Sequence, residues 1–259
     1  MNGCIYAMYF SPTHTTQTVT RAAAKGLGSK LDMEWKDGDL TAPDSRGGVW
    51  HYGKDDVLVF GFPVYGGRIP AFLESCMKNL HGDQTQAVVL GVYGNRDYED
   101  ALLEAADLLT ANGFQVIAAG AFIGEHSMTA KVAAGRPDPQ DLEAVEQFAQ
   151  AVGEKILAGD RKPAGIPGQR PYKERGPSAP SAPKTSEACT KCMICVKGCP
   201  MGIIDAGDPS RIGDGCIRCC ACVKSCPVNA KCFDDERAAK ITTMLETNFM
   251  ARREPEYFL

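Results

Sequence analysis

The stretch IYAMYFSPTHTTQTV, residues 5–19, decides how the first part of the chain folds. It begins with an uninterrupted apolar run, Ile5–Phe10, and ends in residues with helical spacing. Apolar runs without alternation are typical of strands in parallel sheets, which are buried on both faces. A serine and several threonines separate strand and helix. Hydroxyls and free backbone N–H groups at a helix N-terminus attract a phosphate group. An N-cap with surplus threonines is the alternative.

Strand-like and helix-like segments go on alternating up to about residue 159. This alternation predicts an α/β fold, a doubly wound sheet of five parallel strands covered by helices. Ligands of such sheets bind beside the carboxyl ends of the strands, so we expect the chemistry in the loops that follow the strands. The other expected strands are Met33–Lys36, Val57–Phe62, Ala87–Val92 and Val116–Phe122, and the expected helices are Thr16–Leu31, Ala71–Leu80, Tyr98–Asn112 and Pro139–Leu157.

Composition limits the kind of protein that this can be. The 259 residues carry a formal net charge of −4, and 44% of them are hydrophobic, which is normal for a globular protein. No apolar run approaches the ~18 residues of a membrane-spanning helix, and the first residues lack the basic region of a secretory signal. We therefore expect a cytoplasmic protein without a membrane span. The small negative charge and the lack of a long basic block argue against nucleic acid as a partner.

The 12 cysteines are distributed very unevenly along the chain. Only Cys4 and Cys76 lie in the α/β part, and the others lie between Cys189 and Cys232. In a reducing cytoplasm such clusters hold metal or do redox work more often than they form disulfides. A stretch rich in Pro, Gly, Ser and Ala separates the two parts and indicates a linker or a strap on the surface. The predicted units are residues 1–159, the linker 160–188, the cysteine-rich unit 189–233 and the tail 234–259. An apolar stripe in the tail predicts a docked helix, and its residues are Ala238, Ile241, Leu245 and Phe249.

Two copies of one cysteine motif fill this segment. CTKCMICVKGCP, residues 189–200, and CIRCCACVKSCP, residues 216–227, both read C-x₂-C-x₂-C-x₃-C-P. This repeat is the signature of ferredoxins with two [4Fe–4S] clusters, whereas structural zinc needs four ligands, usually from two C-x₂-C pairs. In the signature, the fourth cysteine of each copy ligates the cluster of the other copy. One predicted ligand set is Cys189, Cys192, Cys195 and Cys226, the other is Cys216, Cys219, Cys222 and Cys199, and the spare thiols are Cys220 and Cys232.

Three later loops follow strands of the predicted sheet. FGFPVYGGRIP, residues 60–70, combines the flat ring of Tyr65 with Gly66-Gly67, which lets a ligand approach the backbone closely. VYGNRDY, residues 92–98, leads into a helix with an acidic start. The loop after residue 122 is long, as functional loops often are, and contains Glu125 and His126. His126 could move a proton near neutral pH, or it could be an ordinary histidine of a lid or interface loop.

The loop after the first strand resembles the S/T-x-T-G-x-T phosphate loop of flavodoxins, which bind FMN. Here it reads SPTHTT, residues 11–16, with His14 where the family usually has glycine. A left-handed backbone is less favourable for His than for Gly but is not excluded, and the imidazole could lie near the phosphate, at a domain interface or in solvent. The resemblance implies that the next two loops contact the flavin ring. The implied FMN-binding residues are Ser11, Thr13, His14, Thr15 and Thr16, then Pro63, Val64, Tyr65, Gly66 and Gly67, then Tyr93, Gly94, Asn95, Arg96 and Tyr98.

Over both units, the chain resembles the fused flavodoxin–ferredoxin proteins of anaerobes, the EFR1-type ferredoxins. The resemblance implies that FMN and two [4Fe–4S] clusters exchange electrons with each other and with a redox partner, either a protein or a small molecule. A flavin-dependent reductase of a small substrate and a redox sensor or assembly module are the alternatives. No catalytic residue is assigned, and the sequence leaves the partner, the direction of electron flow and homodimer formation open.

Overall fold

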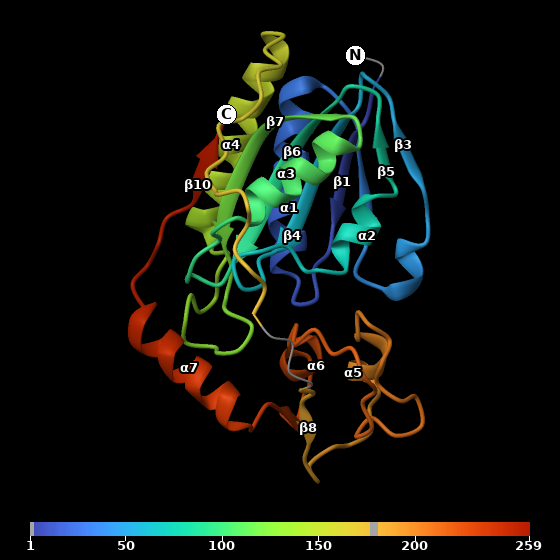
Figure 1. Ribbon diagram of the computed structural model, residues 1–259, viewed down its shortest axis with the longest axis vertical. Coiled ribbons are helices and arrows are strands. Elements are labelled where there is room, and N and C mark those ends of the chain that lie inside the picture. Colours follow the sequence, from blue (N-terminus) through green and yellow to red (C-terminus); the bar gives the residue numbers. More distant parts are fainter. Residues whose placement is uncertain (1–2, 177–180) are drawn as a thin grey trace.

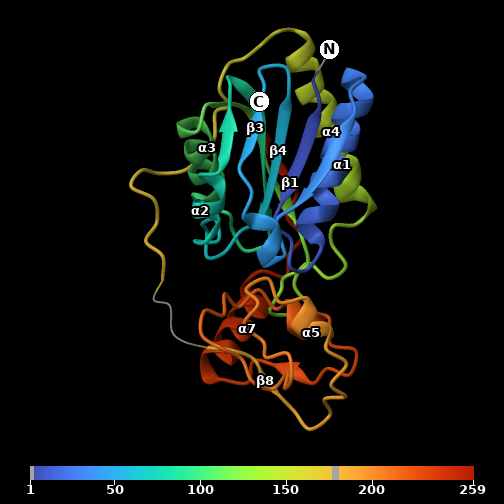
Figure 2. The ribbon, with the colours of Figure 1, turned by 90° about the vertical axis from the view of Figure 1, so that its right-hand side faces the viewer.

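The computed structural model describes residues 3–176 and 181–259 and shows a large α/β unit above a smaller cysteine-rich unit (Figure 1). Seen from the side, a long segment of chain runs outside the α/β unit on its way to the small unit (Figure 2). After the small unit, the chain returns to the α/β unit through a helix and a strand. The cysteine-rich unit is therefore connected to the α/β unit by chain on both of its sides.

Parallel strands form the centre of the α/β unit. They are β1 (Ile5–Tyr9), β2 (Trp35–Asp39), β4 (Val57–Pro63), β6 (Thr85–Tyr93) and β7 (Phe114–Ile123). Their spatial order is β7-β6-β4-β1-β2, which is the 2-1-3-4-5 order of flavodoxin-like folds when the parallel strands are numbered along the chain. The expected doubly wound parallel sheet is thus confirmed. A sixth strand that we did not predict, β10 (Glu256–Phe258), pairs antiparallel with β7.

Helices cover both faces of this sheet (Figure 2). They are α1 (Thr15–Leu31) and α4 (Pro139–Leu157) on one face, and α2 (Leu73–Met77) and α3 (Ala101–Ala111) on the other. α4 begins at the predicted residue because Asp138 and Asp141 form a capping box and proline occupies the first turn. None of the helices in the described parts of the chain is long and apolar enough to cross a membrane.

Two of the expected helices are shorter than predicted. The segment expected to be helical up to Leu80 forms α2 over five residues only. Leu80 instead starts β5 (Leu80–Gly82), which pairs parallel with β3 (Trp50–Tyr52) beside the main sheet. A short 3₁₀ helix, η1 (Pro43–Arg46), precedes β3. α3 begins at Ala101 rather than three residues earlier because Glu99 has a left-handed backbone, with φ 43°, which a helix cannot accommodate.

The expected linker begins as a strap on the surface of the α/β unit. Within residues 160–176, Lys173 pairs with Glu99 at 2.6 Å, and Arg175 pairs with Glu104 at 2.8 Å. Each of these partly exposed ion pairs adds little to the stability of the fold. A series of them nevertheless defines the path of this segment along the surface. The next residues of the expected linker, 177–180, lie outside the described residues.

The cysteine-rich unit contains two short helices, one in each copy of the cysteine motif. α5 (Ile194–Lys197) and α6 (Ala221–Lys224) each follow a residue with a left-handed backbone, at φ 63° and φ 61°. A small antiparallel pair, β8 (Lys184–Thr185) with β9 (Lys231–Cys232), joins the two ends of the unit. The two motifs thus repeat in backbone conformation as well as in sequence.

The tail forms the expected helix, α7 (Glu236–Asn248), which is capped by the Asp235 carboxylate through the N–H of Ala238. This helix lies below the loops of the α/β unit and beside the cysteine-rich unit (Figure 1). Leu245 and Ala238 are its buried residues, which agrees with the apolar stripe seen in the sequence.

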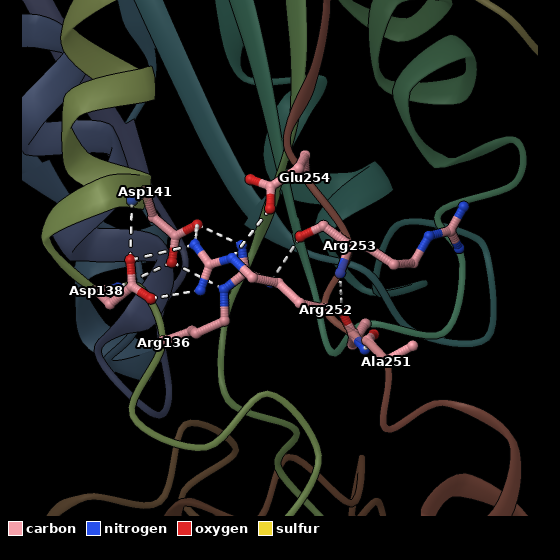
Figure 3. A network of polar contacts seen from close by, with 8 residues as sticks. Arg136, Asp138, Asp141, Ala251, Arg252, Arg253 and Glu254 are labelled. Carbon is pink, nitrogen blue, oxygen red and sulfur yellow. Dashed lines mark hydrogen bonds and ion pairs between the residues drawn. The ribbon is translucent and has the colours of Figure 1, made fainter.

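A network of charged side chains holds the segment that follows α7 (Figure 3). Arg252 Nη1 lies 2.6 Å from an oxygen of Asp138, next to the buried pair of Arg136 with Asp141. Arg136 also donates from Nη1 to the carbonyl oxygen of Arg253 at 2.7 Å. These contacts fix the tail against the loop before α4 and lead the chain into β10.

Candidate functional site

A cavity of about 390 Å³ lies at the carboxyl end of the parallel strands, where this fold places its ligands. We call it the sheet-edge cavity. Its walls come from four loops of the α/β unit, from the cysteine-rich unit and from α7. The loop residues that line it are Thr13, Thr15, Pro63, Val64, Tyr65, Gly66, Tyr93, Gly94, Arg96, Glu125, His126 and Ser127. The loops selected from the sequence therefore meet at one cavity.

The loop after β1 sends two of its predicted residues, Thr13 and Thr15, into the cavity wall. Ser11 has another task, because its hydroxyl accepts the N–H of Gln17 at 2.9 Å and so supports the start of α1. His14 is exposed and has φ 67°, so it adopts the left-handed backbone that glycine takes most easily. Thr16 is buried and does not line the cavity. Thr13 and Thr15 are thus the predicted residues of this loop that line the cavity near the start of α1.

The loop after β4 forms the boundary between the cavity and the cysteine-rich unit. Tyr65 exchanges backbone hydrogen bonds of 2.9 and 3.2 Å with Arg68. Burial raises the pKa of the Tyr65 hydroxyl, and the nearby cysteine thiols Cys219, Cys220 and Cys216 raise it further. Tyr65 is therefore a neutral phenol that lies near cysteines of the cysteine-rich unit.

Gly67 belongs to this loop but does not line the cavity. It has φ 85°, and a Cβ atom there would lie 1.6 Å from a carboxylate oxygen of Glu99. Only glycine fits this position. Its role in the structure is to let the loop after β4 pack against the loop after β6.

The loop after β6 contributes Tyr93, Gly94 and Arg96 to the cavity, but not the other two predicted residues. Asn95 is 1% exposed, and its side-chain amide donates to the carbonyl oxygens of residues 249 and 251 at 2.7 and 2.8 Å. Tyr98 packs edge-on against Tyr93 and donates its hydroxyl to a carboxylate of β10 at 3.0 Å. Asn95 and Tyr98 therefore hold the tail and do not line the cavity.

His126 lines the cavity from the loop after β7. Its Nδ1 atom accepts the N–H of Met128 at 3.1 Å. Burial lowers the pKa of His126 to about 4, and the cations Lys224 and Arg96 contribute to this shift. A Cβ atom on Gly94 would lie 2.4 Å from the ring, so glycine is needed for the imidazole to pack there. The imidazole is neutral at neutral pH, which makes it unsuited to donating a proton as the cation.

The remaining wall of the cavity was not predicted from the sequence. The cysteine-rich unit supplies Ile217, Arg218 and Cys219, and the apolar side of α7 supplies further residues. The sequence around these residues does not place them at the cavity, because they reach it only through the docking of the second unit and of the tail. The contributing residues of α7 are Arg237, Ile241, Met244 and Leu245.

The cysteine-rich unit contains two smaller hollows of its own. An inner hollow is lined by Cys199, Cys216, Cys219, Cys222 and the spare Cys220. An outer hollow is lined by Cys189, Cys192, Cys195 and Cys226. The two sets of four cysteines are those that the motif spacing groups together. The inner hollow also shares Ile217, Arg218 and Cys219 with the sheet-edge cavity, so the two spaces are neighbours.

The chemical environment of these thiols differs along the motif. Burial raises the pKa of Cys219 and of Cys222 to about 12, with neighbouring thiols adding to the effect. Burial also acts on Cys226, but backbone N–H donors, above all Val228 and Ala230, outweigh it and lower the pKa of that thiol. The Ala230 N–H lies 3.1 Å from the Cys226 sulfur. Within the described ranges, no three His, Cys, Asp or Glu side chains converge closely enough to hold a single metal ion.

The two spare thiols have different surroundings. The Cys220 sulfur lies 3.5 Å from the carbonyl oxygen of Arg218 and also bonds to the side chain of Ser127 in the α/β unit. Cys220 is 2% exposed, whereas Cys232 is exposed on β9. Cys220 thus takes part in the contact between the units.

Comparisons with known proteins were made for the whole chain. No family model and no curated protein matches it. Among solved structures it is similar to a flavodoxin from the domain Archaea, with 15% identity over 60% of this chain and 99% of that chain and a TM-score of 0.42. It is also similar to an azoreductase from Bacillus anthracis str. Sterne (13% identity, 60% and 100% covered, TM-score 0.42) and to Flavodoxin 2 from Bacillus cereus (17%, 60% and 99%, 0.41). The strand order of the sheet, rather than these low similarities, gives the α/β unit its flavodoxin-like fold.

Proposed function

We propose that the sheet-edge cavity binds FMN, that the two hollows hold [4Fe–4S] clusters, and that the chain passes electrons between these centres and an external redox partner. The observation that carries this proposal is the shared wall of the sheet-edge cavity and the inner hollow, made by Ile217, Arg218 and Cys219. A shared wall means that centres in the two spaces would be close neighbours. The finer resemblance to fused flavodoxin–ferredoxin proteins is part of this proposal.

The residues around the sheet-edge cavity fit a flavin with a terminal phosphate. Thr13 and Thr15 place hydroxyls at the N-terminus of α1, a helix of 17 residues whose dipole favours an anion. Tyr65 and Tyr93 offer aromatic walls, and Gly66 lets the backbone come close to a ring. Small-ligand sites typically measure ~300–1,000 Å³, and the volume of the sheet-edge cavity, about 390 Å³, lies within that range.

The residues of the two hollows fit cubane clusters. Each hollow has the four thiolate donors that a [4Fe–4S] cluster requires. Backbone N–H groups directed at a ligand sulfur, as at Cys226, are a common means of tuning such clusters. Raised thiol pKa values at Cys219 and Cys222 mean that metal binding there would release protons, since the thiolate is the ligand.

A bound flavin would supply two-electron chemistry, and each cluster would carry one electron at a time. The chain itself provides the arrangement. Tyr65 and Ile217 line the sheet-edge cavity where the two units meet. His126 stays neutral beside the cavity. The strap and the tail keep both units together, so that exchange between the centres does not depend on diffusion.

A flavin-dependent reductase of a small substrate is the second candidate function. The observation that favours it is the apolar wall that Ile241, Met244 and Leu245 of α7 add to the cavity, beyond what the α/β loops provide. An apolar wall opposite a flavin suits an apolar acceptor molecule. Steady-state turnover of small quinone-type or azo-type acceptors by the purified protein would favour the reductase. Rapid exchange with low-potential carrier proteins and no such turnover would favour the carrier, and the absence of both would favour the sensor or assembly alternative.

The first experiment is anaerobic purification followed by flavin and metal analysis. We expect roughly eight iron and eight sulfide per chain, the content of two [4Fe–4S] clusters, together with FMN after reconstitution. Zinc in place of iron would contradict the assignment of the hollows. Failure to bind added FMN would contradict the assignment of the cavity, whatever the metal content.

Serine substitutions test the division of the cysteines. Cys195 lines the outer hollow, so Cys195→Ser should lose roughly half of the iron, one cluster out of two. Cys220→Ser is the matched control, because the Cys220 thiol is already bonded to Arg218 and Ser127. Iron and sulfide counts decide the question. Equal iron loss in both variants would contradict the proposed ligand sets.

Valine substitutions test the phosphate end of the cavity. Replacing Thr13 and Thr15 together by valine removes two hydroxyls, each contributing about 1.5–3 kcal/mol if it bonds a charged group. FMN affinity should therefore fall on the order of 100-fold or more. The control is Thr18→Val, because the Thr18 hydroxyl bonds to the carbonyl oxygen of His14 and is exposed. Titration of the apoprotein with FMN measures the affinities, and an unchanged affinity in the double variant would remove these hydroxyls from the site.

A further inference from the structure

Arg218 occupies the point where the sheet-edge cavity and the inner hollow meet. It lines both spaces and directly precedes Cys219 in the chain. The guanidinium carbon lies 4.7 Å from the centre of the Phe233 ring. Both terminal nitrogens, Nη1 and Nη2, are buried and have no hydrogen-bond partner in the described part of the chain. A side chain with five donors thus presents buried, unpaired N–H groups at the boundary of the two spaces.

A buried guanidinium without a counter-charge is costly, and arginine cannot avoid the cost by losing its proton. The Phe233 ring compensates only in part, through a cation–π contact. The positive charge of Arg218 acts on the carboxylate of Asp235 and helps to lower its pKa. The first cause of that shift is the backbone N–H of Ala238, however, and Arg218 is a lesser cause. The position therefore calls for a negative charge that the described residues do not provide.

The internal repeat supplies a comparison. Lys191 occupies the same place in the first motif as Arg218 in the second, and the two residues have nearly the same left-handed backbone, with φ 55° and 54°. Lys191, however, is exposed and does not line the outer hollow. The repeat is thus symmetric in backbone, but its cations differ. The cation beside the outer hollow is Lys231, which is buried and donates to Thr185 and Pro209, whereas Nη1 and Nη2 of Arg218 have no such partners among the described residues.

We propose that Arg218 tunes the inner centre: its permanent positive charge stabilises the negative charge that the cluster in the inner hollow gains on reduction. The inference rests on the proposed function. Reduction adds one electron and no proton to a [4Fe–4S] cluster, so the site becomes more negative by one charge, which the guanidinium partly neutralises. Replacing this charge by a neutral side chain therefore lowers the reduction potential of the inner cluster.

Redox titration of the anaerobic holoprotein, followed by EPR and visible absorption, tests this assignment. Arg218→Gln should lower the midpoint potential of one iron–sulfur wave by at least the equivalent of a tenfold change in the equilibrium constant, about 59 mV for one electron. Arg218→Lys keeps the charge and should recover most of this loss. Lys191→Gln removes a charge from the matching exposed position and should leave both waves within a small fraction of that shift.

The outcomes separate the inference from the function on which it rests. If the wild type holds both clusters and Arg218→Gln leaves their potentials unchanged, or shifts both equally, the inference is wrong while the proposed function stands. If Arg218→Lys behaves like Arg218→Gln, the side chain acts through packing and the tuning role is wrong. If the wild type binds no iron–sulfur cluster, the proposed function itself fails before any variant is measured. Iron and sulfide counts on each variant identify a protein that has lost a cluster.

Discussion

At the scale of single residues, the sequence predicts what is local and misses what arrives from far along the chain. Thr13 and Thr15 line the cavity because they directly follow a strand and start a helix, a relation visible in fewer than twenty residues. Asn95 sits in an equally suggestive loop but is bound to tail residues more than 150 positions later. Nothing in the sequence around Arg218 predicted that its guanidinium nitrogens would be buried, because their burial depends on the contact between two units.

His126 illustrates a consequence of burial for the dependence of stability on pH. Histidine in an unfolded chain titrates near pH 6.5, whereas in the fold the pKa is lowered to about 4. Above pH 6.5 the imidazole is neutral in both the folded and the unfolded state, so His126 does not make the free energy of unfolding depend on pH. As the pH falls from 6.5 towards 4, the unfolded state gains a proton that the folded state does not, so stability is lost over this window. We expect the wild type to lose about 2 kcal/mol between pH 7 and pH 5 through this residue.

The change that tests this prediction is His126→Gln, which should remove that loss. Urea unfolding under anaerobic conditions at pH 7 and pH 5 gives the free energies. The control is His81→Gln, at an exposed position, which should keep the wild-type pH dependence. An equal pH dependence in wild type and His126→Gln would show that burial of this imidazole does not govern acid stability.

At the scale of elements, the parallel sheet was predictable and its periphery was not. β4 and β6 are buried along nearly their whole length, and such continuous apolar runs identify central strands. β3 and β10 have three residues each, too few for a periodic pattern, and β10 is one edge of the sheet. The tail helix was predicted from its apolar stripe, but its position against the cavity was not. An apolar stripe shows which side of a helix is buried, but not which part of the protein it packs against.

The attachment of the tail depends on Asn95. Its amide donates to two carbonyl oxygens of the tail, and its oxygen accepts the N–H of Arg253 at 3.3 Å. Asn95→Ala leaves these buried groups unsatisfied, at about 1–3 kcal/mol for such a loss. We expect faster hydrogen exchange and faster proteolysis in residues 249–258. Asn248→Ala is the control, because Asn248 is exposed and bonds only within α7, and it should leave both rates near those of the wild type.

At the scale of the whole molecule, polar contacts join the two units on two sides, and Ile217 packs against the core of the α/β unit. Lys224 of α6 pairs with Glu125 in the loop after β7, close to the cavity. On the other side, Arg46 of η1 donates to the carbonyl oxygen of Pro200. These polar contacts help to fix the orientation of the two units. The strap and the tail supply the rest of the attachment.

Charge reversal at Lys224 tests whether this contact sets the orientation for electron exchange. Lys224→Glu places two carboxylates side by side, and the lost pair is worth on the order of 1 kcal/mol before repulsion is counted. We expect slower equilibration between flavin and clusters after photoreduction, and recovery when Glu125→Lys is added. Lys240→Glu changes the net charge equally on the exposed side of α7 and should leave the rate unchanged. A single variant as fast as the wild type would contradict the role of the contact.

The position of β10 ties the maturation of one unit to the protection of the other. β10 covers the outer border of β7, and it follows the cysteine segment in the order of synthesis. Until that segment has folded and the tail has come back, the border of β7 stays bare, and bare strand borders invite pairing with other chains. If the cysteine-rich unit needs the proposed clusters in order to fold, a shortage of iron would leave this border uncovered, and newly made chains would pair with one another through the sheet of the α/β unit.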